Sequence, residues 1–392
     1  MKPAVLVTDA WQRKAVPIIR SLGRRGIPVL AADNRRWSMG FFSRYCVKSL
    51  VCPSPEQEPE RFLQWVLTLA RRGDFQVLFA IDERSLDVLT PHRDSLAQHV
   101  KVPMVNGDTY LQARDKALTL NLAQRLGIPC PRTVLAEDEG DLRTMAATWD
   151  FPIVIKPRRS SGSRGLKVAS SPEELVSLYR SVAKDYPRPL LQEFIPPGGE
   201  TLGVEVLMNR NSEPRATFVH RRLREYPPQG GPSTLRESIA APELAAEAVR
   251  LLKAMDWYGV AMVEFKRDPR DGILKLMEVN PKFWGSIALP IAAGLDFPYL
   301  LYRLAVEGDI PPTSSYKTGV LCRWLIPGDI LHFLHNPRRF HLTPSFFQFR
   351  GDNLYYDLED LDDPGPMWGM LLSAVTSLAA PGFWKRYFSA NR

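Results

Sequence analysis

The sequence predicts an α/β protein in which a doubly wound parallel sheet is followed by α+β domains. Its N-terminal third alternates short apolar runs with segments of helical periodicity, the pattern of parallel strands connected by helices. Its central part instead pairs strands across a Ser/Gly loop and across a short turn, which favours hairpins. With 392 residues, the chain is long enough for two or three domains, each with its own core.

Composition excludes several classes of protein. An apolar content of 45% and an aromatic content of 10% exclude a disordered chain. The four cysteines form neither a Cys-x-x-Cys pair nor a zinc spacing, so we expect unpaired thiols and a cytoplasmic protein. These cysteines are Cys46, Cys52, Cys130 and Cys322.

The net charge is +8, and most of the excess lies before residue 115. Only residues 35–45 combine basic and aromatic side chains, so the sequence disfavours a nucleic-acid partner. An anionic substrate or a membrane surface suits the N-terminal excess better.

The elements of the first third follow in order. Strands are expected at 5–7, 29–32 and 77–81, and helices at 16–22 and 62–69. Ligands of such sheets bind beyond the carboxyl ends of the strands, and Asp82 and Glu83 follow one of these ends. The same two acids also suit the start of a helix. Residues 8–12 lack the glycine fingerprint of a dinucleotide site, which argues against a nicotinamide dehydrogenase.

A basic strand–loop–strand segment follows a helix predicted over 116–126. The strand 151–157 carries Lys156 near its end, and residues 151–172 contain five basic residues and no acid. A Ser/Gly loop with free backbone N–H groups beside a lysine is a suitable cradle for a polyphosphate. An ordinary basic hairpin on the surface is the alternative. Ser171 is expected to cap the next helix.

The run 190–200 is an apolar strand that breaks into a Pro-rich link. Such a link offers an apolar slot with backbone donors and acceptors, which suits an adenine ring. Glu200 at its end suits ribose hydroxyls.

Two further strands, 261–265 and 274–280, are joined by a turn at 268–272, and each carries one acid among apolar residues. A carboxylate in such surroundings is costly unless it is paired or binds a metal. Glu264 and Glu278, with Asn280, present the oxygen ligands that Mg²⁺ prefers. A structural salt bridge is the alternative for each acid singly.

Taken in order, these residues resemble the ATP-grasp superfamily, which includes D-alanine:D-alanine ligase and biotin carboxylase, and particularly its carboxylate-amine ligases. The resemblance implies a Rossmann-like pre-ATP-grasp domain followed by an ATP-grasp fold of two α+β subdomains. The expected domains are 1–114, 115–309 (a lid-type subdomain 115–195 and a catalytic subdomain 196–309) and a C-terminal extension 310–392.

The resemblance also implies roles for residues. ATP phosphates would contact Lys116 and Lys156 and lie under a loop of Ser161, Gly162, Ser163, Arg164 and Gly165. Adenine would be held along Gln192, Glu193, Phe194 and Ile195, and ribose by Glu200. Glu264, Glu278 and Asn280 would bind Mg²⁺, with Mn²⁺ as an alternative.

One position departs from the family pattern. Many relatives carry arginine after the Asn-Pro pair, whereas this chain carries Lys282, which keeps the charge but loses the two-pronged guanidinium. Three arginines in the family-like stretch 220–234 are expected to compensate for this loss, namely Arg221, Arg222 and Arg224. Arg164 is expected to offset phosphate charge in catalysis together with Lys156 and Lys282. A solvated basic strand face is the alternative for the residues in 220–234.

The function implied is ADP-forming ligation of a small-molecule carboxylate to an amine through an acyl phosphate. A kinase of the same fold and a non-catalytic nucleotide-binding or membrane-associated scaffold are the two alternatives. The apolar stretch 367–380 predicts a terminal helix too short to span a bilayer. That helix is either buried or a peripheral membrane contact, and the sequence leaves the oligomeric state open.

Overall fold

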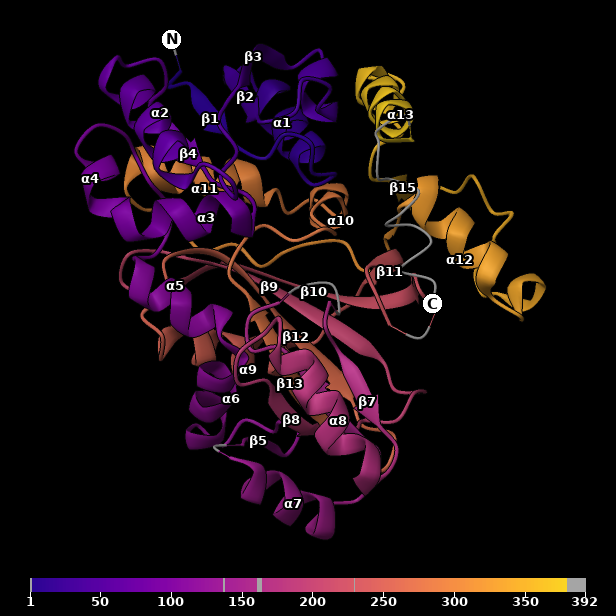
Figure 1. Cartoon of the computed structure of the whole chain (residues 1–392). Helices are drawn as coiled ribbons and strands as arrows, with labels where there is room; N and C mark the ends of the chain where they lie inside the picture. The colour runs from indigo at the N-terminus through magenta and orange to yellow at the C-terminus, as the bar shows by residue number, and fades with distance from the viewer. Residues whose placement is uncertain (1, 137, 161–163, 229, 379–392) are drawn as a thin grey trace. The chain divides into compact units, whose positions relative to one another are not determined.

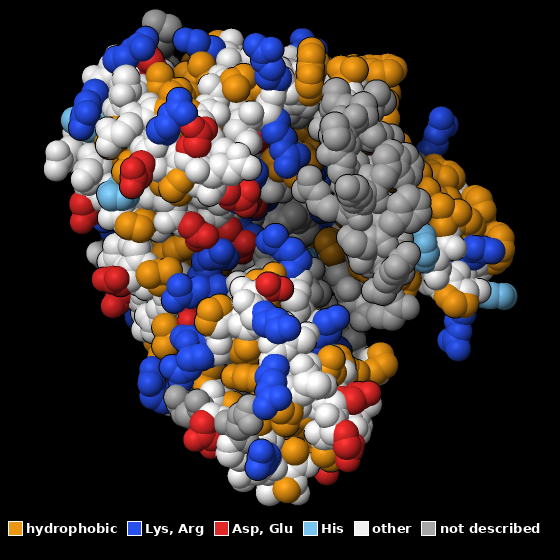
Figure 2. Space-filling model, in the orientation of Figure 1, with side chains coloured by type: hydrophobic (Ala, Val, Ile, Leu, Met, Phe, Trp, Pro, Cys, Tyr) orange, Lys and Arg blue, Asp and Glu red, His pale blue; other side chains and the backbone are white. Residues whose placement is uncertain are grey.

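A computed structural model describes residues 2–136, 138–160, 164–228 and 230–378 of the chain. The chain forms two compact units, and each draws on separate stretches of the sequence (Figure 1). Unit 1 contains residues 1–107, 282–311 and 355–392, and unit 2 contains residues 108–281 and 312–354. The three domains expected from sequence stay a prediction beside this division. Acidic and basic side chains both occur over the face drawn in Figure 2, as expected for 51 basic and 43 acidic residues.

Unit 1 is built on a parallel sheet with the strand order β3-β2-β1-β4. Its strands are β1 (Val5–Val7), β2 (Val29–Asp33), β3 (Cys46–Val51) and β4 (Val77–Phe79). Every residue of β1, β2 and β4 is buried, which explains the continuous apolar runs that predicted them. The sequence analysis missed β3. It is an edge strand with mostly exposed side chains, so no apolar run marks it.

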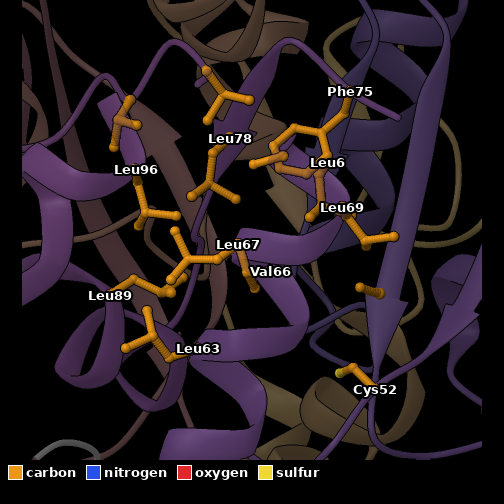
Figure 3. Packing of buried hydrophobic residues seen from close by; sticks show 14 of the residues in the cluster. Leu6, Cys52, Leu63, Val66, Leu67, Leu69, Phe75, Leu78, Leu89 and Leu96 are labelled. Atoms are coloured by element: carbon orange, nitrogen blue, oxygen red, sulfur yellow. The ribbon is translucent and has the colours of Figure 1, made fainter. Parts of the chain in front are cut away.

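Helices complete unit 1. They are α1 (Ala15–Gly23), α2 (Pro59–Arg71), α3 (Glu83–Leu89), α4 (Arg93–Ala97), α10 (Ala288–Ala292), α11 (Phe297–Glu307) and α13 (Gly365–Leu378), with short 3-10 turns η1 (Met39–Phe42) and η2 (Thr90–His92). In the core, Val66 and Leu67 of α2 lie against Leu6 and Leu78 of the sheet (Figure 3). The α/β fold class predicted from periodicity is confirmed.

The last described helix, α13, packs against η1 in unit 1. It begins two residues before the helix predicted over 367–380, and the described residues end at Leu378. Arg20 of α1 fixes the approach to α13, since its guanidinium donates to the Asp363 carboxylate at 2.9 Å and to the Leu358 carbonyl at 2.9 Å. Among the described residues, no helix has both the length and the apolar character that a membrane span requires.

Unit 2 contains a small antiparallel sheet with the order β5-β8-β6-β7. Its strands are β5 (Thr133–Leu135), β6 (Ile153–Lys156), β7 (Lys167–Ala169) and β8 (Leu190–Glu193). Helices α7 (Glu139–Thr148) and α8 (Pro172–Ala183) share its apolar core. Ser171 precedes α8 as expected, but its side chain makes no capping hydrogen bond, so that part of the prediction was wrong.

The larger sheet of unit 2 has the order β13-β12-β9-β10-β11-β14-β15. Its strands are β9 (Thr201–Met208), β10 (Pro214–Glu225), β11 (Ser233–Ser238), β12 (Gly259–Arg267), β13 (Leu274–Asn280), β14 (Leu321–Arg323) and β15 (Leu354–Tyr356), which lies where the chain passes from unit 2 to unit 1. Unit 2 also contains α5 (Gly107–Arg114, whose first residue ends unit 1), α6 (Lys116–Arg125), α9 (Pro242–Lys253), the π-turn η3 (Leu325–Asp329), α12 (Ile330–His335) and the 3-10 turn η4 (Arg339–His341).

The buried ion pair between Arg20 and Asp363 yields a stability prediction. Arg20→Met should lower the free energy of unfolding of unit 1 by about 3–5 kcal/mol, because it leaves the buried Asp363 carboxylate without its cation. Urea unfolding, with hydrogen exchange in α1 to identify the unit, measures this loss. The control Arg24→Met removes an exposed arginine paired with Asp360 and should cost at most about 1 kcal/mol. Equal losses in the two variants would contradict the assignment.

Candidate functional site

Two carboxylates face each other across the hairpin of β12 and β13. Glu264 is the register partner of Glu278, so both side chains lie on the same face of the larger sheet. Burial raises the pKa of Glu264, and the carboxylate of Glu278 raises it further, while Arg222 opposes the rise. Like charges so placed need cations close by.

Lys116 and Arg222 supply these cations. The Lys116 ammonium lies 3.1 Å from a carboxylate oxygen of Glu278 and donates to the Ser160 carbonyl at 2.7 Å. The Arg222 guanidinium donates to the Glu264 carboxylate. Burial works to raise the pKa of Glu278, but the charge and hydrogen bond of Lys116, with the contributions of Lys156 and Asn280, together bring this pKa below its ordinary value. Asn280 donates to Glu278 at 3.2 Å, so its amide oxygen belongs to the same cluster.

The local structure at the start of α6 holds the Lys116 side chain beside Glu278. Asp115 is the N-cap of α6, and its carboxylate accepts from the backbone N–H of Ala117 at 3.0 Å. The same buried carboxylate lies 2.6 Å from the guanidinium of Arg158. The backbone N–H of Lys116 donates to the Arg158 carbonyl at 3.1 Å. The start of α6 is therefore tied to the basic loop after β6.

Lys156 ends β6 and is buried. Burial lowers its pKa to about 8, and the neighbouring charge of Lys116 adds to this effect, while Glu278 and Glu264 oppose it. The two lysines and the two carboxylates therefore influence one another within unit 2.

The rest of the predicted phosphate loop is described in part. Arg164 is exposed, and Gly165 has a φ of +75°, a left-handed conformation that favours glycine. The predicted loop residues Ser161, Gly162 and Ser163 lie outside the described residues.

The predicted adenine link runs from β8 to β9. Gln192 is buried and donates to the hydroxyl of Thr133 at 2.7 Å, and the carboxylate of Glu193 lies 3.0 Å from the ammonium of Lys275. Phe194 is half-buried, and the carbonyl of the buried Ile195 accepts from the Lys266 ammonium at 3.0 Å.

Glu200 follows the link and forms ion pairs with two arginines. Its carboxylate lies 3.1 Å from Arg221 and 3.4 Å from Arg267. About two fifths of its side chain is exposed, so its oxygens are accessible from solvent.

The structure separates the two arginines expected to act together. Register shifts in the β10–β11 pairing flank Arg224. Arg222 contacts Glu264, whereas the buried Arg224 lies 2.8 Å from the Asp329 carboxylate and donates to the Pro344 carbonyl. The alternative of a solvated basic face does not fit either residue, because both are engaged with partners.

Lys282 belongs to unit 1, where its ammonium lies 2.8 Å from the carboxylate of Glu83. Beside it, Lys14 lies 2.9 Å from Asp82 and donates to the Phe283 carbonyl at 2.9 Å. The two acids after β4 therefore bind lysines. Asp82 occupies the N-cap position of α3 without a capping hydrogen bond from its side chain.

A buried pair beside the carboxylates was not predicted from the sequence. Neighbouring residues on five strands form one row across a single face of the larger sheet: Glu278, Glu264, Gly203, His220 and Ser238. Nδ1 of the buried His220 lies 2.6 Å from the carboxylate of Glu205, which is on the same face as Gly203. Burial raises the pKa of Glu205, and His220 opposes the rise. An acid inside the apolar run 202–208 was the signal available in the sequence.

Comparisons with known proteins identify the fold. Residues 185–325 match the family model "ATP-grasp in the biosynthetic pathway with Ter operon", and residues 115–191 match "Carbamoyl-phosphate synthase L chain, ATP binding domain". Biotin carboxylase of Campylobacter jejuni superposes with a TM-score of 0.69 at 16% identity, over 82% of this chain and 74% of that chain. This chain has the ATP-grasp fold. The fold predicted from the ordered motifs is confirmed.

Several curated relatives of this chain are D-alanine–D-alanine ligases, which confirms the resemblance stated from the sequence. D-alanine–D-alanine ligase of Pseudomonas entomophila is 28% identical over 207 residues, which cover 50% of this chain and 64% of the relative. The resistance protein VanA of Enterococcus faecium is 32% identical over 230 residues, which cover 52% of this chain and 65% of VanA. The chain thus spans a little under two thirds of these two relatives. An L-amino acid ligase of Bacillus licheniformis has a TM-score of 0.62 at 18% identity, over 80% of this chain and 78% of that chain.

Gly203 generates a prediction about the row of residues in the larger sheet. A Cβ at this position would lie 2.3 Å from Cε1 of the His220 ring, so Gly203→Ala should lower the free energy of unfolding by about 1–3 kcal/mol. Urea unfolding of Gly203→Ala, His220→Ala and the double variant separates the cause. Gly203→Ala should lower the free energy of unfolding by less in the His220→Ala background, where the ring is absent. An equal decrease in both backgrounds would show that the ring does not require glycine at position 203.

Proposed function

We propose that this chain is an ADP-forming ligase that joins a small-molecule carboxylate to an amine. The observation that carries the proposal is the register of Glu264 opposite Glu278, with Lys116 and Lys156 beside them. Oxygen ligands next to cationic side chains form the type of site that phosphoryl transfer uses. The relatives that are named as ligases support a reaction that joins two substrates.

Nucleotide binding divides among three parts of unit 2. Lys116 and Lys156, with the loop that contains Arg164 and Gly165, bind the phosphates. The link from Gln192 to Ile195 holds the adenine ring. The carboxylate of Glu200 accepts hydrogen bonds from the ribose hydroxyls and gives up one of its two arginine partners.

The donors Glu264, Glu278 and Asn280 fit Mg²⁺, because two carboxylates and an amide oxygen lie at neighbouring positions of one hairpin. Among the described residues no group of three His, Cys, Asp or Glu side chains forms a complete metal cage. A site with few protein ligands is typical of Mg²⁺ that is also bound by substrate phosphates. When bound, the metal neutralises phosphate charge and orients the transferred group.

The side chains provide position and charge. A substrate carboxylate oxygen forms a bond to the γ-phosphorus as the bond to the bridging oxygen breaks, which releases ADP. The amine nitrogen then bonds to the acyl carbon, the bond to phosphate breaks, and the amine loses a proton. Lys156 and Arg164 would offset charge on the phosphate oxygens, and the guanidinium of Arg222, which donates to Glu264, would bind an anionic substrate.

We propose different roles for Lys282 and Arg224. Lys282 stays our candidate for binding the substrate carboxylate or acyl phosphate, in exchange for its present partner Glu83. Arg224 is buried against Asp329, so we assign it to anchoring the segment after β14 and not to the reacting groups.

A product assay tests the function. The purified chain, ATP and Mg²⁺ are incubated with pools of carboxylates and amines, and mass spectrometry identifies what forms. The proposal predicts ADP release that depends on both pools and a product equal to the two substrates less water. A product that has only gained a phosphate identifies a kinase and overturns the proposal, as does a chain that binds ATP and forms no ADP with any pair.

Glu278 yields a prediction about turnover. Glu278→Gln should lower the rate of ADP formation by roughly 100-fold or more, because it removes a charged metal ligand from the phosphate site. Asp271→Asn is a matched control in the turn of the same hairpin, and it should retain activity and folding. A Glu278→Gln enzyme that matches this control would contradict the metal assignment.

The pKa of Lys156 predicts how ATP binding depends on pH. With a pKa of about 8 in the free protein, its ammonium is charged below pH 8 and loses its proton above it. ATP affinity should therefore fall roughly tenfold between about pH 7 and about pH 9 through the loss of one charge-assisted contact. Calorimetry of Lys156→Arg, whose guanidinium stays charged over this range, should show a flatter profile. Identical profiles for the two proteins would exclude Lys156 as the titrating group.

A further inference from the structure

A second surface lies on unit 2, in residues 330–350, which we call the aromatic arm. The arm contains α12 and η4 and exposes several large apolar side chains. Phe340 is 71% exposed, Phe347 is 59% exposed and Leu334 is 55% exposed. Hydrophobic, histidine and basic side chains occur together over α12 in Figure 2. Apolar groups gathered in this way on one segment mark an interaction surface more often than chance exposure.

The rings of the arm form one cluster centred on Phe333. Its ring stacks on Phe346 with centroids 4.2 Å apart, and it meets the edges of Phe340 and Phe347 at 5.5 Å each. Phe346 also meets Phe349 at 5.7 Å. Contacts of this kind hold the exposed rings in place, so the arm presents them as a fixed surface.

A buried ionic anchor connects the arm to the larger sheet. The carboxylate of Asp329, directly before α12, lies 2.6 Å from Arg323 of β14 and 2.8 Å from Arg224 of β10, and accepts from the Thr234 hydroxyl at 3.0 Å. Arg323 also donates to the Phe346 carbonyl at 2.8 Å. Both ends of the ring cluster are thus fixed to the sheet.

The charge of the arm has one sign. Residues 330–350 contain three arginines and no acid. Arg338, Arg339 and Arg350 form no ion pair with any described residue. The guanidinium of Arg339 lies over the rings of Phe333 and Phe340, at 5.9 and 5.6 Å from their centroids. Cations beside exposed rings are therefore available to an anionic partner.

We propose that the aromatic arm binds the surface of an anionic membrane. Exposed phenylalanines enter the boundary between headgroups and acyl chains, while arginines beside them contact lipid phosphates. Phe340 and Phe347 are each more than half exposed, as interfacial insertion requires. This site is separate from the peripheral contact predicted for the C-terminal helix, and it is independent of the proposed ligation. It implies that the enzyme works on a membrane surface.

Vesicle sedimentation with the full-length chain tests the proposal. Vesicles of phosphatidylcholine containing phosphatidylglycerol are compared with pure phosphatidylcholine at low and high salt. The chain should bind the anionic vesicles and dissociate as salt rises. The double variant Arg338→Gln/Arg339→Gln should weaken binding roughly 30-fold. Phe340→Ser/Phe347→Ser should also lose binding, because it removes the inserted rings.

Two controls isolate the arm. Arg125→Gln/Arg143→Gln changes the net charge equally through exposed arginines elsewhere on unit 2, and Ile273→Ser removes an exposed apolar side chain from the β12–β13 turn. Both should bind anionic vesicles like the unmodified chain. ATP affinity, measured on every variant, shows that the nucleotide site is intact.

Three outcomes would overturn the proposal. They are no binding of the unmodified chain to anionic vesicles, equal binding by the arm variants and their controls, and arm-dependent capture of a soluble acidic protein in place of the vesicles.

Discussion

The structure of the site depends on one electrostatic constraint, the placement of Glu264 opposite Glu278 on neighbouring strands. Two like charges on a buried face are unstable unless cations or protons compensate them. Lys116 and Arg222 meet this need from different parts of unit 2, namely the first turn of α6 and the strand β10. Under the proposed function, a divalent ion compensates the two carboxylates and leaves Lys116 and Arg222 to bind phosphate or substrate anions.

The larger sheet contains further buried polar side chains beside the two acids. The row that begins at Glu278 and Glu264 continues through Gly203 to His220, so the glycine leaves space for a buried imidazole and its partner Glu205. Unit 2 therefore has polar side chains on both sides of Gly203 across one face of this sheet. The same sheet, through Arg224 and Asp329, also holds the aromatic arm in position.

Sequence reasoning succeeded where chemistry was local. The turn at 268–272 joins the two strands that carry Glu264 and Glu278, so the pairing of these strands could be predicted, as could the buried parallel strands from their apolar runs. The register of the two acids could not be predicted, because a bulge between Glu264 and Phe265 shifts the pairing and brings Glu264 opposite Glu278. Prediction from the sequence failed where a side chain contacts a residue that is distant in the sequence. Arg224 was expected beside Arg222, but the irregular register around it and the distant Asp329 decide its place. The edge strand β3 carries no apolar pattern, and the partner of His220 is visible only once β9 and β10 pair.

The central claim is that the opposed carboxylates bind a divalent metal together with ATP. Calorimetric titration of ATP with and without Mg²⁺, in the unmodified chain and in Glu264→Gln, tests it most directly. The account predicts that Mg²⁺ strengthens ATP binding in the unmodified chain and that most of this gain disappears in the variant, which still binds ATP alone. An equal gain from Mg²⁺ in both proteins would contradict it.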